Sequence, residues 1–261
     1  MIRTILLLSP IYITLFWSIA LSGNRKKNSS PHKLLSKIML FPAICFTALF
    51  FYLEPFPEIY PYFDCIFQYA VSLIFPLYYI YFRLLTIDEK FSLKSHAQYL
   101  AIPVVLATMY CIAAFLTPWN EYKTWLFNEN TYSYALNIQF LNVMRNILRL
   151  LFLFQLVITV IGNQFLIHKY GVRAEQFYSD IEEKNYKNAR ILNYCIIIVS
   201  VVAFITFAVE HEFKFPQDIM LYIVFTISSV ILYLIGYMGI KQESINPTFD
   251  FVSKEIVTQQ L

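Results

Sequence analysis

The chain has 261 residues, of which 58% are hydrophobic and only 14% are charged, and its formal net charge is +3. This composition excludes a water-soluble globular protein, because so few polar side chains cannot cover the surface of a soluble fold of that size. We therefore expect an integral membrane protein.

Seven apolar runs follow one another along the chain. Each has the length of about 19 to 24 residues that a helix needs to cross about 30 Å of hydrocarbon. The runs cover residues 4–22, 34–53, 63–85, 98–117, 146–168, 190–209 and 218–240. A β-barrel is excluded, because these runs do not alternate polar and apolar residues. The sequence predicts an all-α fold, a seven-helix transmembrane bundle over residues 1–240 with a cytoplasmic tail or linker at 241–261.

Lys and Arg residues lie mostly on one side of the predicted helices. Fifteen of the 20 fall in the first, third and fifth loops and in the tail, whereas Arg3, Lys123 and Lys214 fall on the opposite side. Cytoplasmic loops carry the excess of positive charge, so we expect the amino terminus outside and the carboxyl terminus in the cytoplasm. Residues 25–27 are basic and follow the first apolar run, which favours an uncleaved helix over a signal peptide.

Two arginines, Arg145 and Arg149, lie at the start of the fifth apolar run. A guanidinium cannot shed its proton and costs at least a few kcal/mol in hydrocarbon. We expect these side chains to reach a partner, a water-filled cavity or an anionic ligand. The alternative, for Arg145 and also for Arg149, is a position among the lipid headgroups, with the side chain extending to water.

Polar residues recur at helical spacing in the third, fifth and seventh spans, which places them on one face of each helix. Such faces are expected to line the bundle interior, where they bind a ligand or form hydrogen bonds between helices. The predicted ligand-binding residues, grouped by helix from the third to the seventh, are Asp64, Gln68, Ser72, Arg145, Asn146, Arg149, Glu210, His211 and Tyr222. The hypothesis is an outward-open cavity in which the arginines meet Asp64 or a small anion.

Several local signals lie outside this predicted site. The longest outer loop, 118–134, carries four aromatic residues suited to a membrane interface, namely Trp119, Tyr122, Trp125 and Tyr132. Residues 179–182 fit a capping box, so we expect the sixth helix to start before the membrane does. Prolines within the spans predict kinks at Pro10, Pro42, Pro76 and Pro103. Cys65 and Cys111 both lie toward the outer side, which leaves a disulfide between them open.

Catalysis has little support in the sequence. The five glycines form neither a phosphate-binding loop nor a nucleophile elbow, and the four histidines are scattered. Glu210, His211 and Glu212 are the one compact set of metal-capable side chains, but adjacent residues of a helix point apart. The last span has no lysine to form a Schiff base, which excludes a retinal protein. We expect no enzyme, no metal ion and no cofactor.

The segment 143–150, which reads VMRNILRL, opens the fifth of seven aromatic-rich spans, after a short outer amino terminus and before a cytoplasmic tail. In these features the chain resembles, over essentially its whole length, the membrane half of bacterial membrane-anchored AraC-type transcription regulators. The resemblance implies an inner-membrane sensor whose state passes through a linker to a helix-turn-helix domain that binds DNA. A homodimer is also compatible with it.

The chain departs from that family after Lys241, where there is no room for recognition helices or their phosphate contacts. Direct nucleic-acid binding by this chain is therefore not expected. It is either the sensor portion of a longer product or a stand-alone paralogue that acts through a partner protein. The sequence favours a membrane receptor that binds a small ligand outside and signals to its tail for transcription regulation. The alternative is a small-solute transporter, although no internal repeat is visible.

Overall fold

The computed structural model describes the backbone of residues 2–23, 30–54, 58–86, 88, 91–127, 136–177, 183–212 and 217–242. Side chains are described over the same ranges except at 2, 30, 93, 170–177, 183–187, 203–212 and 217–220. All regular elements in these ranges are α-helices: α1 (Ile2–Gly23), α2 (Ser30–Ile38), α3 (Leu40–Leu53), α4 (Tyr60–Thr86), α5 (Leu93–Leu116), α6 (Trp119–Phe127), α7 (Leu136–Phe177), α8 (Glu183–Glu212) and α9 (Gln217–Lys241).

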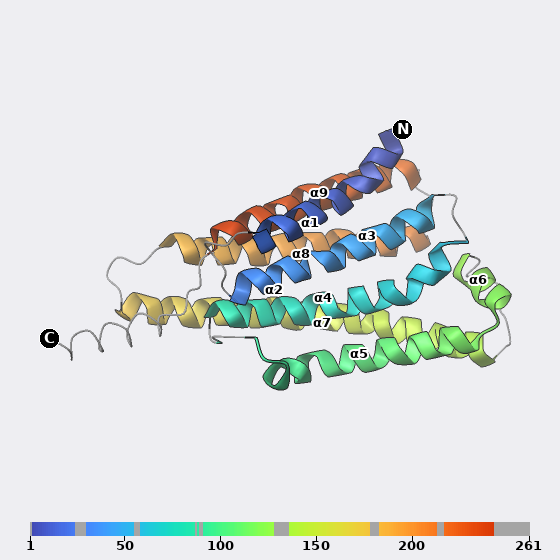
Figure 1. Cartoon of the computed structure of the whole chain (residues 1–261), viewed down its shortest axis with the longest axis horizontal. Coiled ribbons are helices and arrows are strands. Elements are labelled where there is room, and N and C mark those ends of the chain that lie inside the picture. The colour runs from blue at the N-terminus through green and yellow to red at the C-terminus, as the bar shows by residue number, and fades with distance from the viewer. Residues whose placement is uncertain are drawn as a thin grey trace.

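The long helices form an elongated bundle and run roughly along its long axis (Figure 1). α1 and α9 pack together along one side, α4, α7 and α5 form the other side, and α3 and α8 lie between them. One end of the bundle contains the first residues of α1, α4, α7 and α9 and the last residues of α3, α5 and α8. The short helix α6 lies beside this end (Figure 1). We call this end the Asp64 end, and the opposite end, where α4 finishes, the Arg83 end.

Six helical segments are long and apolar enough to cross a membrane. They are Arg3–Gly23, Pro31–Leu53, Tyr60–Thr86, Lys94–Leu116, Leu136–Lys169 and Leu221–Lys241. Large apolar side chains on their outward faces are exposed, for example Phe115 at 84% and Leu150 at 67%, as expected where lipid is the solvent. The chain is therefore an all-α, multi-pass membrane protein. In α8 the apolar segment with described side chains is Asn188–Val202, so the seventh crossing stays a prediction.

The second predicted span is two helices rather than one. α2 ends at Ile38, and α3 starts at Leu40 after a single turn residue, Met39. Pro42 explains the break, because it has no N–H to donate to the carbonyl four residues before it. The other three prolines expected at kinks, Pro10, Pro76 and Pro103, lie within α1, α4 and α5.

The fifth span starts ten residues earlier than predicted. α7 begins at Leu136 and has 42 residues, a length of roughly 63 Å that far exceeds the hydrocarbon thickness. Arg145 and Arg149 consequently lie in its third and fourth turns instead of at its start. The prediction erred because the polar residues Asn137, Gln139 and Asn142 mask the beginning of the helix in a hydropathy profile.

The loops also differ from the simple expectation of turns between spans. Residues 119–127, within the loop predicted at 118–134, form α6, which is not among the predicted helices. α8 begins at Glu183, several residues before its apolar part, in agreement with the predicted early start of the sixth helix. The capping-box residues 179–182 and the tail from residue 243 lie outside the described residues.

Small residues allow the closest helix contacts. A Cβ atom on Gly236 would lie 2.1 Å from Cγ of Trp17, and one on Gly239 would lie 2.2 Å from a methyl carbon of Leu35. Membrane helices have no water to drive them together, so they depend on such close packing. These two glycines of α9 therefore hold it against α1 and α2, on the side of the bundle opposite α5.

Candidate binding site at the Asp64 end

Asp64, in the second turn of α4, is buried with 1% of its surface exposed. Three tyrosine hydroxyls donate hydrogen bonds to its carboxylate: Tyr60 to Oδ1 at 3.2 Å, Tyr110 to Oδ2 at 2.5 Å and Tyr122 to Oδ2 at 2.6 Å. A buried carboxylate needs such donors, because it has lost the hydrogen bonds of water. The donors come from α4, α5 and α6, so the carboxylate joins three helices.

The hydroxyl of Tyr122 is protonated and acts as a donor at neutral pH. Burial, and next the negative charge of Asp64, raise the pKa of Tyr122 above its ordinary value of 10.0. Both effects disfavour a phenolate beside a carboxylate. The short bond between Tyr122 and Asp64 is thus a charge-assisted bond from a neutral phenol.

Arg145 on α7 supplies the positive charge of this cluster. Its Cζ atom lies 3.7 Å from the centre of the Trp125 ring, a cation–π contact. The indole Nε1 of Trp125 donates a 2.7 Å hydrogen bond to Oδ1 of Asn142, one turn before Arg145. The negative charge of Asp64 attracts the guanidinium electrostatically. The cluster therefore pairs an acid and a base between aromatic side chains.

The short helix α6 covers the cluster. Tyr122 and Trp125 point into the bundle and are each 3% exposed, and their rings stack at 28° with centroids 6.0 Å apart. On the outer face of α6, Lys123 forms an ion pair with the exposed Glu58. Tyr122 and Trp125 are thus part of the site and not of an interfacial belt, whereas Trp119 is 40% exposed and Tyr132 lies outside the described residues. The expected open cavity is closed over Asp64 in this conformation.

The remaining predicted residues follow the cluster along α4 and α7: Gln68 and Ser72 lie one and two turns after Asp64, and Asn146 and Arg149 lie one and four residues after Arg145. Arg149 donates a 3.4 Å hydrogen bond to the exposed Asn146. Gln68 is half-buried one turn after Asp64, and its backbone carbonyl accepts a hydrogen bond from the buried Ser72 at 2.7 Å. Ser72 therefore satisfies its hydroxyl within its own helix, as serines in membrane helices commonly do.

The two remaining helices contribute less to this cluster than the sequence suggested. Tyr222 lies on α9, which packs mainly against α1 and α8 and so belongs to the other side of the bundle. Glu210 and His211 end α8 at the Asp64 end, but their side chains are outside the described ones. The site is thus built by α4, α5, α6 and α7.

Four aromatic residues and Asn142 complete the site, and none of them is among the predicted ligand-binding residues. Tyr60 lies one helical turn before Asp64, so the stripe on α4 contained the signal for it. Tyr110, Tyr122 and Trp125 come from other helices and have no such local signal. The thiols of Cys65 and Cys111 are both free, and Sγ of Cys111 points to the carbonyl of Cys65 at 3.8 Å, so the disulfide left open above is absent here.

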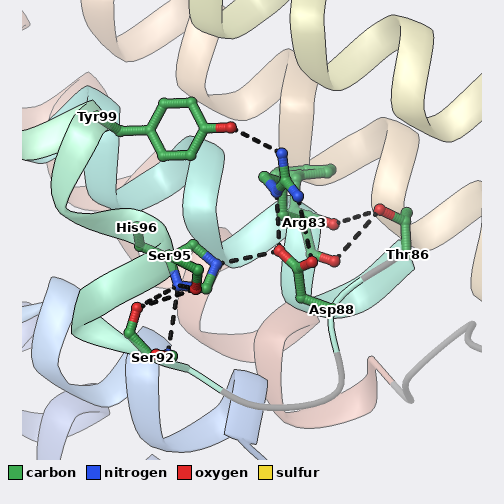
Figure 2. A network of polar contacts seen from close by, with 8 residues as sticks. Arg83, Thr86, Asp88, Ser92, Ser95, His96 and Tyr99 are labelled. Carbon is green, nitrogen blue, oxygen red and sulfur yellow. Dashed lines mark hydrogen bonds and ion pairs between the residues drawn. The ribbon is translucent and has the colours of Figure 1, made fainter.

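A second polar cluster lies at the Arg83 end, between α4 and α5 (Figure 2). The guanidinium of Arg83 donates two hydrogen bonds to the carboxylate of Asp88, of 2.8 and 3.2 Å, and a third to the hydroxyl of Tyr99 at 2.7 Å. Nε2 of the buried His96 lies 3.0 Å from Oδ2 of Asp88. These hydrogen bonds stabilise the segment that connects α4 to α5.

The carboxyl of Asp88 is ionised in this cluster. Burial taken alone raises the pKa of Asp88, but hydrogen bonds from Arg83 and His96, and the positive charge of Arg83, outweigh it. The pKa of Asp88 consequently lies below its ordinary value of 3.8. Two opposite charges with a fork geometry form a more directional contact than a surface ion pair.

The fold and these contacts define a multi-pass helical membrane protein with a polar cluster at each end of α4. Neither a protein-family model nor a curated protein sequence matches the chain. Its function is therefore argued from the two clusters and from the distribution of charge.

Proposed function

We propose that the chain is a membrane receptor module: a small ligand binds from outside at the Asp64 end, and the bundle relays the change to the cytoplasmic Arg83 end and the tail. The basic loops support this orientation, because positive charge accumulates on the cytoplasmic side. The proposed location is the inner membrane of a bacterial cell.

The observation that carries the proposal is that a single helix, α4, contains the central residue of both clusters. Asp64 is in its second turn and Arg83 is in its last, about 28 Å apart along the axis at 1.5 Å per residue. Each residue is bonded to neighbouring helices, so a shift or rotation of α4 at one end changes contacts at the other.

Signalling by such a module requires two arrangements of comparable free energy. The described conformation is the closed one, with α6 on the cluster and Asp64 buried. A ligand that binds the open arrangement more tightly shifts the population in proportion to that difference in affinity. In this scheme the tyrosines released by Asp64 allow α4 to move against α5 and α7.

The output proposed for the module is transcription regulation through a helix-turn-helix domain or partner protein in the cytoplasm. The resemblance to membrane-anchored AraC-type regulators supports this output. Pairing of two modules as a homodimer would then bring two DNA-binding units together, as operators with two half-sites require. No contact between this chain and nucleic acid is part of the proposal.

Hydrogen–deuterium exchange of the chain in lipid nanodiscs tests the relay. Tyr122→Phe removes one hydroxyl from Asp64 and should raise exchange both in α6 and at the Arg83 end, residues 83–99. Tyr62→Phe, which removes the hydroxyl of an exposed tyrosine two residues before Asp64, is the control and should change neither.

The proposal is wrong if exchange at residues 83–99 is the same in wild type and Tyr122→Phe while exchange in α6 rises. Reconstituted vesicles test the alternative of a transporter, because a receptor moves no net solute across the bilayer. Saturable uptake of a solute that is lost in Tyr122→Phe would favour transport instead.

A further inference from the structure

The candidate site is filled by side chains of the chain itself. The phenol of Tyr122 donates to Asp64 at 2.6 Å, and the indole of Trp125 lies flat on Arg145 at 3.7 Å. Both side chains come from α6, and both are almost completely buried. The occupant of the site is therefore a pair of neutral aromatic rings with one O–H and one N–H donor.

α6 is short and lies beside the end of the long helices (Figure 1). It has nine residues, fewer than the roughly 12 to 15 at which an isolated helix becomes stable in water. Thr117 and Pro118 separate it from α5. Asn120, Glu121 and Thr124 leave its other face exposed and polar. Release of α6 would also expose Leu126, which is buried, and Phe127, which packs on two tyrosines.

The charges of the site select against a simple anion. Asp64 and Arg145 carry opposite charges and attract each other, so the pair is neutral as a whole. An anion at Arg145 would compete with the buried carboxylate of Asp64 for the positive charge and would place two negative charges near each other, which is costly in a medium of low dielectric constant. A neutral donor leaves the pair intact.

We propose that the ligand of this site is a small neutral aromatic molecule with a hydroxyl or ring N–H donor, of the phenol or indole class, that competes with Tyr122 and Trp125 and releases α6. This inference rests on the proposed receptor function and replaces the small anion, which was one of the alternatives that the sequence left open. The hydroxyl or N–H of the ligand donates to Asp64, and the ring of the ligand stacks on the guanidinium of Arg145.

Two probes of this class, p-cresol and indole, test the assignment on the chain in lipid nanodiscs. Thermal unfolding reports binding, because a ligand of the folded state raises the melting temperature. Alkylation of Cys65, which lies beside Tyr122, reports release of α6. We expect both probes to raise the melting temperature and to accelerate alkylation of Cys65. Toluene, which has no donor, and benzoate, which is an anion, should do neither.

Two variants separate binding at the cluster from partition into lipid. Tyr122→Phe removes the competing hydroxyl, so it should tighten p-cresol binding roughly tenfold, the effect of one charge-assisted hydrogen bond. Asp64→Asn should abolish the specific stabilisation. Tyr62→Phe is the control for the loss of an exposed hydroxyl and should bind p-cresol as wild type does.

The ligand class is overturned if benzoate binds more tightly than p-cresol, if Tyr122→Phe weakens p-cresol binding, or if the stabilisation persists in Asp64→Asn. These failures differ from failure of the receptor function. If p-cresol does not bind but Tyr122→Phe still alters exchange at residues 83–99, the receptor stands and the ligand class is wrong. If p-cresol competes with Tyr122 but the Arg83 end does not respond, the site stands and the relay is wrong.

Discussion

The guanidinium of Arg145 lies 3.7 Å from the centre of the Trp125 ring and joins a nine-residue helix to the longest helix of the bundle. The indole N–H of Trp125 also donates to Asn142, so Asn142 contacts the edge of the ring and Arg145 contacts its face. The same short helix places Tyr122 on Asp64. These contacts make α6 the element through which the Asp64 end opens or closes.

Trp125→Leu should loosen α6 without unfolding the bundle. The substitution removes a cation–π contact worth about 0.5 to 2 kcal/mol and the indole hydrogen bond to Asn142. Hydrogen exchange in residues 119–127 should become faster. Trp125→Phe keeps a ring on Arg145, so its exchange rate should lie between those of Trp125→Leu and wild type. Equal exchange in all three would show that the contact does not hold α6.

Asp64→Asn should destabilise the bundle by about 3 to 5 kcal/mol, the usual cost of removing one partner of a buried charge pair. The loss should be smaller in an Arg145→Gln background, because the uncompensated guanidinium is then absent. Tyr60→Phe is the control, since its 3.2 Å bond is the longest of the three and should contribute only about 1 kcal/mol. A double-mutant cycle of chemical unfolding measures the coupling, and strict additivity would mean that Asp64 and Arg145 do not interact.

The Arg83 end should weaken in acid. The folded pKa of Asp88 lies below its ordinary value of 3.8, so its carboxylate stabilises the fold above pH 3.8, and this stabilisation is lost as the pH falls through the lowered value. Exchange in residues 83–99 should rise over that range in wild type. Asp88→Asn should show faster exchange at neutral pH and no further change on acidification. An identical acid response in both proteins would assign it to other groups.

Asn163 and Asn193 should behave differently as single and double substitutions. Both are buried, and Nδ2 of Asn163 donates to Oδ1 of Asn193 at 3.3 Å between α7 and α8. Asn163→Leu leaves a buried amide without this bond and should cost about 1 to 3 kcal/mol, whereas replacing both by Leu should be nearly neutral. Unfolding in detergent micelles measures the free energies of unfolding of the single and double variants. A double variant less stable than the single one would contradict the argument.

Gly236→Ala should separate α9 from α1. The added methyl would lie 2.1 Å from Cγ of Trp17, and an overpacked contact of this kind costs roughly 1 to 3 kcal/mol. Gly23→Ala, where the methyl meets no atom within 4 Å, should change the stability by less than about 0.5 kcal/mol. Melting temperatures of the two variants in nanodiscs measure the difference. If Gly236→Ala melts like Gly23→Ala, the ring of Trp17 has room to move.

Part of the candidate site was visible in the sequence. The polar stripe on α4 and the charges of Arg145 and Arg149 follow from helical spacing and from the cost of charge in an apolar run. The start of α7 was missed because its first turns are polar. The role of α6 was missed because its length and composition, 119–127, fit an interfacial loop equally well.

The sequence by itself determined that the protein is helical and lies in a membrane, because the length of an apolar run and the sharing of one helix face are local properties of the chain. The tertiary structure alone decided which polar side chains meet. Tyr110 and Tyr122 reach Asp64 from two other helices, and Arg145 on a third helix packs on the Trp125 ring. Such convergence depends on how helices pack and how a loop folds back, and no spacing along a single helix encodes it.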